Sequence, residues 1–376
     1  YGIKKSVIEK FLSLHKDADY VLITSIMTYW YLGVKEIVDT TKTILPKTKI
    51  VLGGILPMLL PEFTKRFFGD DISYFHCTSI LDKFLDFVFG ENFEHKKFNS
   101  FENYPMPDFS FYNPANYVIL RTSYGCFYNC DYCACQQIIP NYNTKSVAQI
   151  VSEIKSLFYQ TKTSNFVFYD DALFDVTTKR IKKIFYELLK LNLPMKFYTP
   201  NGINPKFIDS ELATLMYNLN FVDLRLSLET SSDNVHSIVD KKIDLKSFEL
   251  GLNNLISAGY KPHEISVYLL AGLPQENIEN VYNSINLVSK YGIKVRLCEF
   301  SPVPKSKLFY TYGFNEYIDP LLHNNTIFLY YGIPQKTIPW CSYSEMQKLK
   351  LYVQKLNKKI KENICLIPTH TCLTKN

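Results

Sequence analysis

The stretch Tyr124-Gly-Cys-Phe-Tyr-Asn-Cys-Asp-Tyr-Cys133 places three cysteines on one short segment, directly after the apolar run Tyr117-Val-Ile-Leu-Arg121. Cys126, Cys130 and Cys133 follow the spacing C-x3-C-x2-C, and an aromatic residue precedes the last of them. Thiolates are soft ligands that suit iron–sulfur clusters and zinc. The stretch therefore predicts a metal centre on a loop that follows a strand.

A four-iron cluster suits these cysteines better than a structural zinc ion. Zinc sites of that kind take four protein ligands, usually as two separated pairs, and the chain has no second C-x2-C pair. Three thiolates would hold three irons and leave the fourth open to a ligand from outside the protein. The amino and carboxylate groups of S-adenosylmethionine (SAM) can chelate such an iron, which places the sulfonium beside the cluster for one-electron cleavage.

Composition limits the number of domains, the kinds of partner and the compartment, but it does not specify the chemistry. A length of 376 residues predicts two domains, each with a sizeable core. The net charge of +6 is mild and interspersed, so the chain carries no nucleic-acid signal. Nine cysteines without a disulfide framework, no membrane-length apolar run and no secretory signal favour a cytoplasmic protein with no membrane partner. Because the sequence starts at Tyr1 rather than Met, we expect further residues upstream.

Apolar strand-like runs alternate with helical patterns along the chain, which predicts an α/β fold. Residues 1–95 are predicted to form a doubly wound, flavodoxin-like domain with strands at 20–25, 49–54 and 72–75. Residues 96–116 are polar, aromatic and punctuated by proline, which is typical of a linker between domains.

Strand–helix units then repeat at lengths that predict a partial (β/α)6 barrel over residues 117–310. The candidate strands lie at 117–121, 166–170, 195–199, 222–228, 265–270 and 295–300. Ligand groups in such barrels gather at the carboxyl ends of the strands. Residues 311–376 are expected to form a short helical tail, in which an amphipathic stretch near 344–361 caps the barrel or covers the substrate.

The cysteine loop and these units resemble the radical SAM superfamily, whose signature is this spacing with an aromatic at the position of Tyr132. The resemblance covers residues 117–310. It implies a [4Fe-4S] cluster on Cys126, Cys130 and Cys133, SAM as a second cofactor, and cleavage of SAM to a 5′-deoxyadenosyl radical. Tyr132 is then expected near the adenine of SAM.

Polar residues at two predicted strand ends are candidate SAM contacts. Asp170 and Asp171 follow the second strand, where the superfamily usually has Gly-Gly-Glu for the methionyl amino group. A carboxylate binds an ammonium group through charge-assisted hydrogen bonds. The alternative is that these residues cap the next helix. Asn201 follows the third strand as a possible polar contact, unless Asn-Gly simply makes the turn.

The fourth strand alternates, so Arg225, Ser227 and Glu229 share one face. Buried charges need partners, which the ribose and methionyl carboxylate of SAM would supply, with an internal Arg225–Glu229 ion pair as the alternative. Gly272, after the fifth strand, would let the backbone approach adenine closely. Steric needs of a strand-to-helix turn could equally explain it.

The N-terminal block resembles the cobalamin-binding branch of this superfamily. That resemblance implies a corrinoid across the strand ends. Thr24 and Ser25 would offer hydroxyls to the corrinoid, and Gly53 and Gly54 would offer a backbone surface without side chains. Tyr29 and Trp30 would place aromatic faces against it. The chain lacks D-x-H-x-x-G, so no histidine of that motif would bind cobalt. A docking domain without a cofactor is the alternative.

These observations together predict a radical SAM enzyme with cobalamin as second cofactor and methyl transfer to an unactivated carbon as its reaction. An external one-electron donor and a substrate of unknown class complete the prediction. One rival is a radical SAM enzyme that rearranges or cyclises its substrate without methyl transfer. The other is a non-catalytic iron–sulfur or electron-transfer protein.

Overall fold

The computed structural model describes residues 2–75, 81–91, 93–94, 98, 100–112, 115–236, 243–273, 275–331 and 340–362. It divides into two compact units. The first comprises Tyr1–Ser100, Tyr132–Ile139 and Ser301–Ile338, and the second comprises Phe101–Asp131, Pro140–Phe300 and Pro339–Asn376. The predicted boundary at residues 95 and 96 lies outside the described residues, as does the chain after residue 362.

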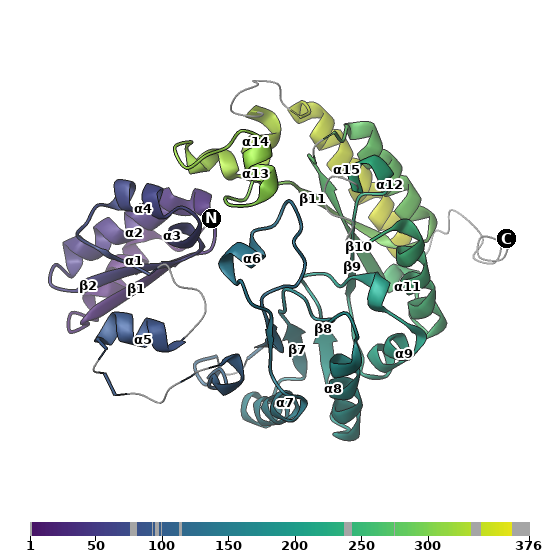
Figure 1. Ribbon diagram of the computed structural model, residues 1–376, viewed down its shortest axis with the longest axis horizontal. Coiled ribbons are helices and arrows are strands. Elements are labelled where there is room, and N and C mark those ends of the chain that lie inside the picture. Colours follow the sequence, from purple (N-terminus) through teal and green to yellow (C-terminus); the bar gives the residue numbers. More distant parts are fainter. Residues whose placement is uncertain are drawn as a thin grey trace. The chain divides into compact units, whose positions relative to one another are not determined.

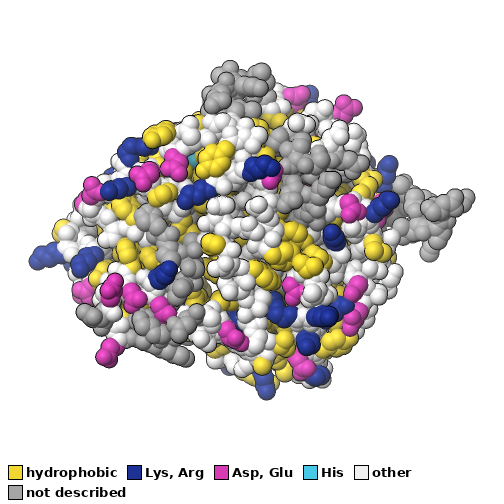
Figure 2. All heavy atoms as spheres, in the orientation of Figure 1, with side chains coloured by type: hydrophobic (Ala, Val, Ile, Leu, Met, Phe, Trp, Pro, Cys, Tyr) yellow, Lys and Arg dark blue, Asp and Glu magenta, His cyan; other side chains and the backbone are white. Residues whose placement is uncertain are grey.

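The surface carries charges of both signs. Figure 2 shows lysine and arginine side chains interspersed with aspartate and glutamate over the visible face. In the described part of the chain, no helix combines the length and the apolar character needed to cross a membrane.

A three-stranded parallel sheet in the order β1-β2-β3 forms the centre of the first unit (Figure 1). Its strands are β1 (Tyr20–Ser25), β2 (Lys49–Gly54) and β3 (Ser73–Tyr74), as predicted. The helices of this unit are α1 (Lys5–Ser13), η1 (Thr28–Trp30), α2 (Tyr31–Ile44), α3 (Ile55–Leu59), α4 (Pro61–Phe68), α5 (Leu81–Phe89), α6 (Cys135–Ile138), α13 (Lys307–Thr311), η5 (Pro320–His323) and α14 (Asn325–Tyr331). The α/β class is therefore confirmed. Across the sheet, the described strands follow their order in the sequence, whereas in a doubly wound sheet this order reverses at one point. The doubly wound arrangement therefore stays a prediction.

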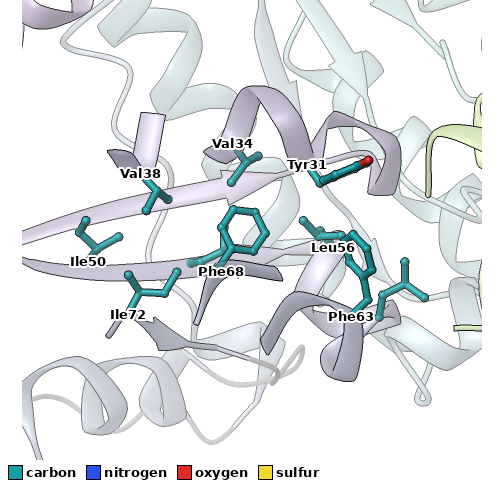
Figure 3. Packing of buried hydrophobic residues seen from close by; sticks show 10 residues of the cluster. Tyr31, Val34, Val38, Ile50, Leu56, Phe63, Phe68 and Ile72 are labelled. Atoms are coloured by element: carbon teal, nitrogen blue, oxygen red, sulfur yellow. The ribbon is translucent and has the colours of Figure 1, made fainter. Parts of the chain in front are cut away.

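Apolar side chains of α2 and α4 pack against one face of this sheet (Figure 3). Val38 on α2 and Leu52 on β2 are 1% and 0% exposed. Phe63 and Phe68 on α4 complete the same cluster, with an edge-on contact between Phe63 and Tyr31. The helical period on α2 and the alternation on β2 thus bury one shared core.

Residues 301–331 belong to the same compact unit as the N-terminal residues, far from them in sequence. The imidazole Nδ1 of His323 lies 3.1 Å from the Thr28 hydroxyl, and the Tyr31 hydroxyl donates to Asp319 at 2.9 Å. Lys305 donates to the carbonyl of Met58 at 2.8 Å. Burial lowers the pKa of His323 to about 4, so this imidazole is neutral at physiological pH.

The second unit contains two parallel sheets, β4-β7-β8 and β9-β10-β11. Two isolated parallel bridges lie between these sheets: Phe197 on β8 pairs with Phe221, just before β9, and Ile203, after β8, pairs with Leu226 on β9. The strands are β4 (Val118–Leu120), β7 (Asn165–Phe168), β8 (Lys196–Tyr198), β9 (Leu224–Glu229), β10 (Ile265–Ala271) and β11 (Lys294–Glu299). All six predicted strands are present, and no pairing between β4 and β11 closes them into a full barrel within the described residues.

Helices follow most of these strands. They are α7 (Val147–Thr161), α8 (Lys179–Lys190), α9 (Ser210–Asn218), α10 (Asp233–His236), α11 (Leu245–Ser257), α12 (Ile278–Lys290) and α15 (Tyr343–Lys361). Side-chain caps start several of them: Ser146, Asp209, Asp244 and Asn277 each accept a hydrogen bond from a first-turn amide. A capping box of Ser342 and Glu345 starts α15.

Helix α15 is the predicted amphipathic stretch, and it packs beside β11 and α12. Its buried side chains are Met346, Leu349, Val353 and Leu356, whereas Leu351 is 53% exposed and lies off this face. Asn357 bonds the backbone of Val295 twice, accepting from its amide at 2.9 Å and donating to its carbonyl at 2.8 Å. The side-chain amide therefore mimics one rung of a neighbouring strand.

Replacing Asn357 with leucine should lower the free energy of unfolding by about 1–3 kcal/mol, because two backbone groups of β11 lose their partner. Urea unfolding monitored by far-UV circular dichroism measures this loss. Leu351→Asn on the exposed side of the same helix is the matched control and should change stability by less than about 0.5 kcal/mol. Equal effects of the two variants would contradict the proposed rung.

Candidate active site

The cysteine loop runs from the strand β5 (Ser123–Tyr124) to α6, and Gly125 begins it with a φ of 85°, which favours glycine. Cys130 is buried, Cys126 is half-buried and Cys133 is exposed. None of the six described cysteines forms a disulfide. Tyr132 is half-buried and belongs, with Cys133, to the first unit.

The donor set fits a four-iron cluster. In such a cluster each thiolate binds a different iron, so the ligands need not meet at one point. Three thiols on one loop therefore match a cluster in chemistry and number.

Asp170 anchors the segment that leads into this loop. Its Oδ1 accepts four hydrogen bonds: from the amide and hydroxyl of Thr122 at 2.9 and 2.8 Å, and from those of Ser123 at 2.5 and 2.7 Å. The residue is 3% exposed, and burial raises its pKa against the opposing effect of these donors. Asp170 thus joins the carboxyl end of β7 to the residues after β4.

The neighbouring Asp171 is exposed. Asn201, also exposed, donates to the carbonyl of Asp170 at 3.0 Å, so the residues that follow β7 and β8 meet here. The guanidinium of Arg121 lies 5.2 Å from the ring of Tyr124 and 5.9 Å from that of Tyr169. Asp171 is therefore the solvent-exposed carboxylate of the pair, whereas Asp170 is buried.

A polar network fills the inner face of β9, β10 and β11 near their amino ends. Asp223, just before β9, accepts from Arg225 at 2.8 and 3.1 Å and from Arg296 at 2.9 and 3.0 Å. Arg225 also donates to the Tyr268 hydroxyl at 3.1 Å, which donates to the carbonyl of Pro200 at 2.8 Å. The network thus joins three strands and the turn after β8.

Arg225 therefore pairs with Asp223 rather than with Glu229, and it lies away from the carboxyl ends where ligands bind. Its contact with SAM stays a prediction. The sequence reasoning missed Asp223, Tyr268 and Arg296. The alternation of polar and apolar residues on β10 and β11 was the available signal, because Tyr268 and Arg296 fall on its inner face.

Ser227 and Glu229 lie further along β9, toward its carboxyl end. Ser227 is 4% exposed, and Glu229 ends the strand with a φ of 68°. A side chain added at Gly202 would come within 2.9 Å of the Ser227 hydroxyl, so this glycine lets the turn after β8 pack closely on β9. Gly272 follows β10 with a φ of 101°, a turn that favours glycine whether or not adenine lies there.

Glu276, which the sequence reasoning did not select, lies buried after β10 at 6% exposure. Burial raises the pKa of its carboxyl to about 8, although the nearby Thr230 opposes the shift. Neither carboxyl oxygen makes a hydrogen bond of ordinary geometry to the described residues. The Trp340 indole donates to its backbone carbonyl at 3.0 Å. Glu276 is therefore mainly a neutral acid at pH 7.

This raised pKa predicts a pH-dependent stability. The folded protein holds the proton up to about pH 8 and the unfolded chain only to about 4.5, so the free energy of unfolding falls as pH rises between these values. Glu276→Gln removes this ionisation. The unfolding free energy of the variant, relative to that of wild type, should therefore rise by at least about 2 kcal/mol between pH 5 and pH 8. Urea unfolding at both pH values measures the change. A constant difference between the two proteins would refute the assignment.

The residues expected to meet cobalamin gather at the carboxyl ends of β1 and β2. Thr24 pairs with Gly53 and Ser25 with Gly54 in the parallel register. A side chain at Gly54 would lie 2.6 Å from the Ser25 carbonyl, whereas one at Gly53 would meet only Phe75, at 3.9 Å. Gly54 is thus required by the packing of the sheet itself.

Of the two aromatic residues that follow β1, Tyr29 and Trp30, one is partly buried and the other is exposed. Trp30 is 52% exposed, while Tyr29 is partly buried, and burial raises its pKa. Their rings meet edge-on at 6.4 Å between centroids. Ile26 and Met27 beside them are 55% and 38% exposed, so an apolar surface lies open at this strand end.

Residues 120–288 match the sequence profile of the radical SAM superfamily. These residues form a radical SAM domain. The domain contains the three loop cysteines and every residue that the sequence analysis assigned to SAM, and it implies a [4Fe-4S] cluster and SAM as cofactors. Among curated protein sequences, none matches the chain.

Two solved structures share the fold of this chain over more than the radical SAM domain. TsrM, a radical SAM methyltransferase from Kitasatospora setae, aligns with a TM-score of 0.63 and 15% identity over 81% of this chain and 67% of that chain. OxsB, a cobalamin-dependent SAM radical enzyme, aligns with a TM-score of 0.61 and 13% identity over 93% of this chain. The chain spans 55% of OxsB, and at these identities the likeness shows a shared fold.

Proposed function

We propose that this protein is a cobalamin-dependent radical SAM enzyme that transfers a methyl group to an unactivated carbon. The observation that carries the proposal is the C-x3-C-x2-C loop after β4, inside the residues that match the superfamily profile. When bound and reduced, the cluster supplies the electron that cleaves SAM to methionine and a 5′-deoxyadenosyl radical. That electron would come from an external one-electron donor, and we place the reaction in the cytoplasm.

The chain's own residues would bind and orient these groups. Cys126, Cys130 and Cys133 would each hold one iron and leave the fourth for SAM. We assign the methionyl amino group to Asp171, because this carboxylate is exposed at the end of β7, whereas Asp170 is buried and its Oδ1 accepts four hydrogen bonds. The other predicted SAM contacts kept in this proposal are Tyr132, Asn201, Ser227, Glu229 and Gly272. Arg225 is not among them, because Asp223 engages it near the amino end of β9.

Two lines of support favour cobalamin in the first unit. TsrM was solved with cobalamin and a [4Fe-4S] cluster, and OxsB with aqua-cobalamin and SAM. In this chain the exposed Ile26, Met27 and Trp30 offer an apolar surface, which a corrin ring would remove from water.

Anaerobic purification followed by iron, sulfide and corrinoid analysis tests both cofactors together. We expect four irons and one corrinoid in each protein molecule, and 5′-deoxyadenosine after reduction with SAM. Failure to form 5′-deoxyadenosine would refute the radical SAM activity. Its formation without bound corrinoid would refute methyl transfer through cobalamin and favour the rearrangement or cyclisation alternative.

A glycine pair separates cobalamin binding from folding. Gly53→Val should leave stability within about 1 kcal/mol, because its side chain has room, but lower cobalamin affinity by about tenfold or more through steric exclusion. Gly54→Val should instead destabilise the first unit, since its φ of 88° and its contact with β1 exclude a side chain. Unchanged affinity in a folded Gly53→Val protein would remove this surface from the cobalamin site.

A further inference from the structure

The third cysteine of the loop receives a hydrogen bond from the backbone. The amide of Cys135 donates to the Sγ of Cys133, with 3.3 Å between nitrogen and sulfur. Cys135 is the first residue of α6, and the first amides of a helix have no partner within the helix. The Cys133 sulfur therefore satisfies a helix amide two residues ahead, as the side chains of Ser and Asp often do.

Packing in the first unit holds this amide in place. Ala134 and Ile139, which flank α6, are 2% and 7% exposed. The amide of Ile138 donates to the Ala134 carbonyl at 3.0 Å, and that of Ile139 to the Cys135 carbonyl at 2.7 Å. The helix also lies against α3, which follows β2. The donor to Cys133 is thus built into the unit that carries the N-terminal sheet.

We propose that Cys135 is a positioning residue whose backbone amide raises the reduction potential of the cluster; this inference rests on the proposed function. A donor withdraws negative charge from a thiolate ligand. It therefore favours the reduced cluster, which is more negative by the one electron that the external donor supplies. Hydrogen bonds to the sulfurs and exposure to solvent are established determinants of such potentials. The Cys135 thiol itself has no part in this effect.

Two substitutions at one position separate the amide from the thiol. Cys135→Ala keeps the N–H, whereas Cys135→Pro removes it at a first helical position, which tolerates proline. In redox titrations of the full chain followed by electron paramagnetic resonance, we expect the wild-type midpoint for Cys135→Ala and a more negative midpoint for Cys135→Pro. Equal midpoints for the two variants, with equal iron contents, would overturn the proposal.

An isotope label decides the outcome if proline displaces the cluster, because Ala134 has a ψ of 16°, which a following proline disfavours. Wild-type protein and Cys135→Ala are labelled with nitrogen-15 cysteine, and their reduced clusters are compared by pulsed paramagnetic resonance. We expect one nitrogen-15 coupling in the wild type that Cys135→Ala lacks, and identical spectra would refute the hydrogen bond. Absence of a cluster from the wild type as well would overturn the proposed function, whereas an intact cluster with equal midpoints removes only this inference.

Discussion

Cys130→Ala should abolish the formation of 5′-deoxyadenosine, with a loss of more than about 100-fold. Changes to residues behind a metal ligand already cost about 10–100-fold, so the loss of a ligand should cost more. The same result is expected for Cys126→Ala and Cys133→Ala. Product is measured by chromatography after anaerobic reconstitution and reduction, and iron content is determined on the same samples.

Cys135→Ala and Cys341→Ala are the matched controls for iron content. Cys135 lies in the same segment as the ligands, and Cys341 is buried in the second unit. Both variants should retain the wild-type iron content, since neither thiol belongs to the C-x3-C-x2-C set. Loss of iron in Cys135→Ala with retention in Cys133→Ala would show that the ligand set is wrong.

Asp170→Ala is the second change with a large expected effect, on stability rather than on chemistry. It leaves four buried donors of Thr122 and Ser123 without their acceptor, which should cost about 3–5 kcal/mol of unfolding free energy. The displaced segment leads directly to Cys126, so iron content should fall as well. Urea unfolding of the apoprotein measures the first effect, and iron analysis measures the second.

The adjacent carboxylate provides the control for this prediction. Asp171→Ala should change stability by less than about 0.5 kcal/mol, because the residue is exposed, and should weaken SAM binding instead. Asp170→Asn keeps an oxygen acceptor and should lose less stability than Asp170→Ala. If Asp170→Ala were as stable as wild type but bound SAM poorly, Asp170 would be the SAM ligand and Asp171 would not.

The strands of this fold could be predicted because each is a local pattern. Runs such as residues 20–25 and 265–271 combine apolar and β-branched residues in stretches of strand length, which a single sequence displays directly. The cysteine spacing is equally local. Both therefore needed no knowledge of how distant segments meet.

Contacts between distant segments could not be predicted in this way. The pairing of Asp223 with Arg296 depends on the register of β9, β10 and β11, which the sequence of one strand does not contain. The choice between Asp170 and Asp171 depends on which side chain turns inward after β7. The association of His323 with Thr28, across most of the chain, likewise arises only from tertiary packing.

The double hydrogen bond from Asn357 has a consequence for self-association. A terminal strand with unpaired backbone groups is a template for the addition of another chain, and natural proteins block such templates with side chains, bulges or covering helices. In β11, Asn357 already occupies the backbone amide and carbonyl of Val295, and α15 lies beside the strand. Intermolecular sheet extension at this rung would have to displace Asn357 first, which protects this flank against aggregation.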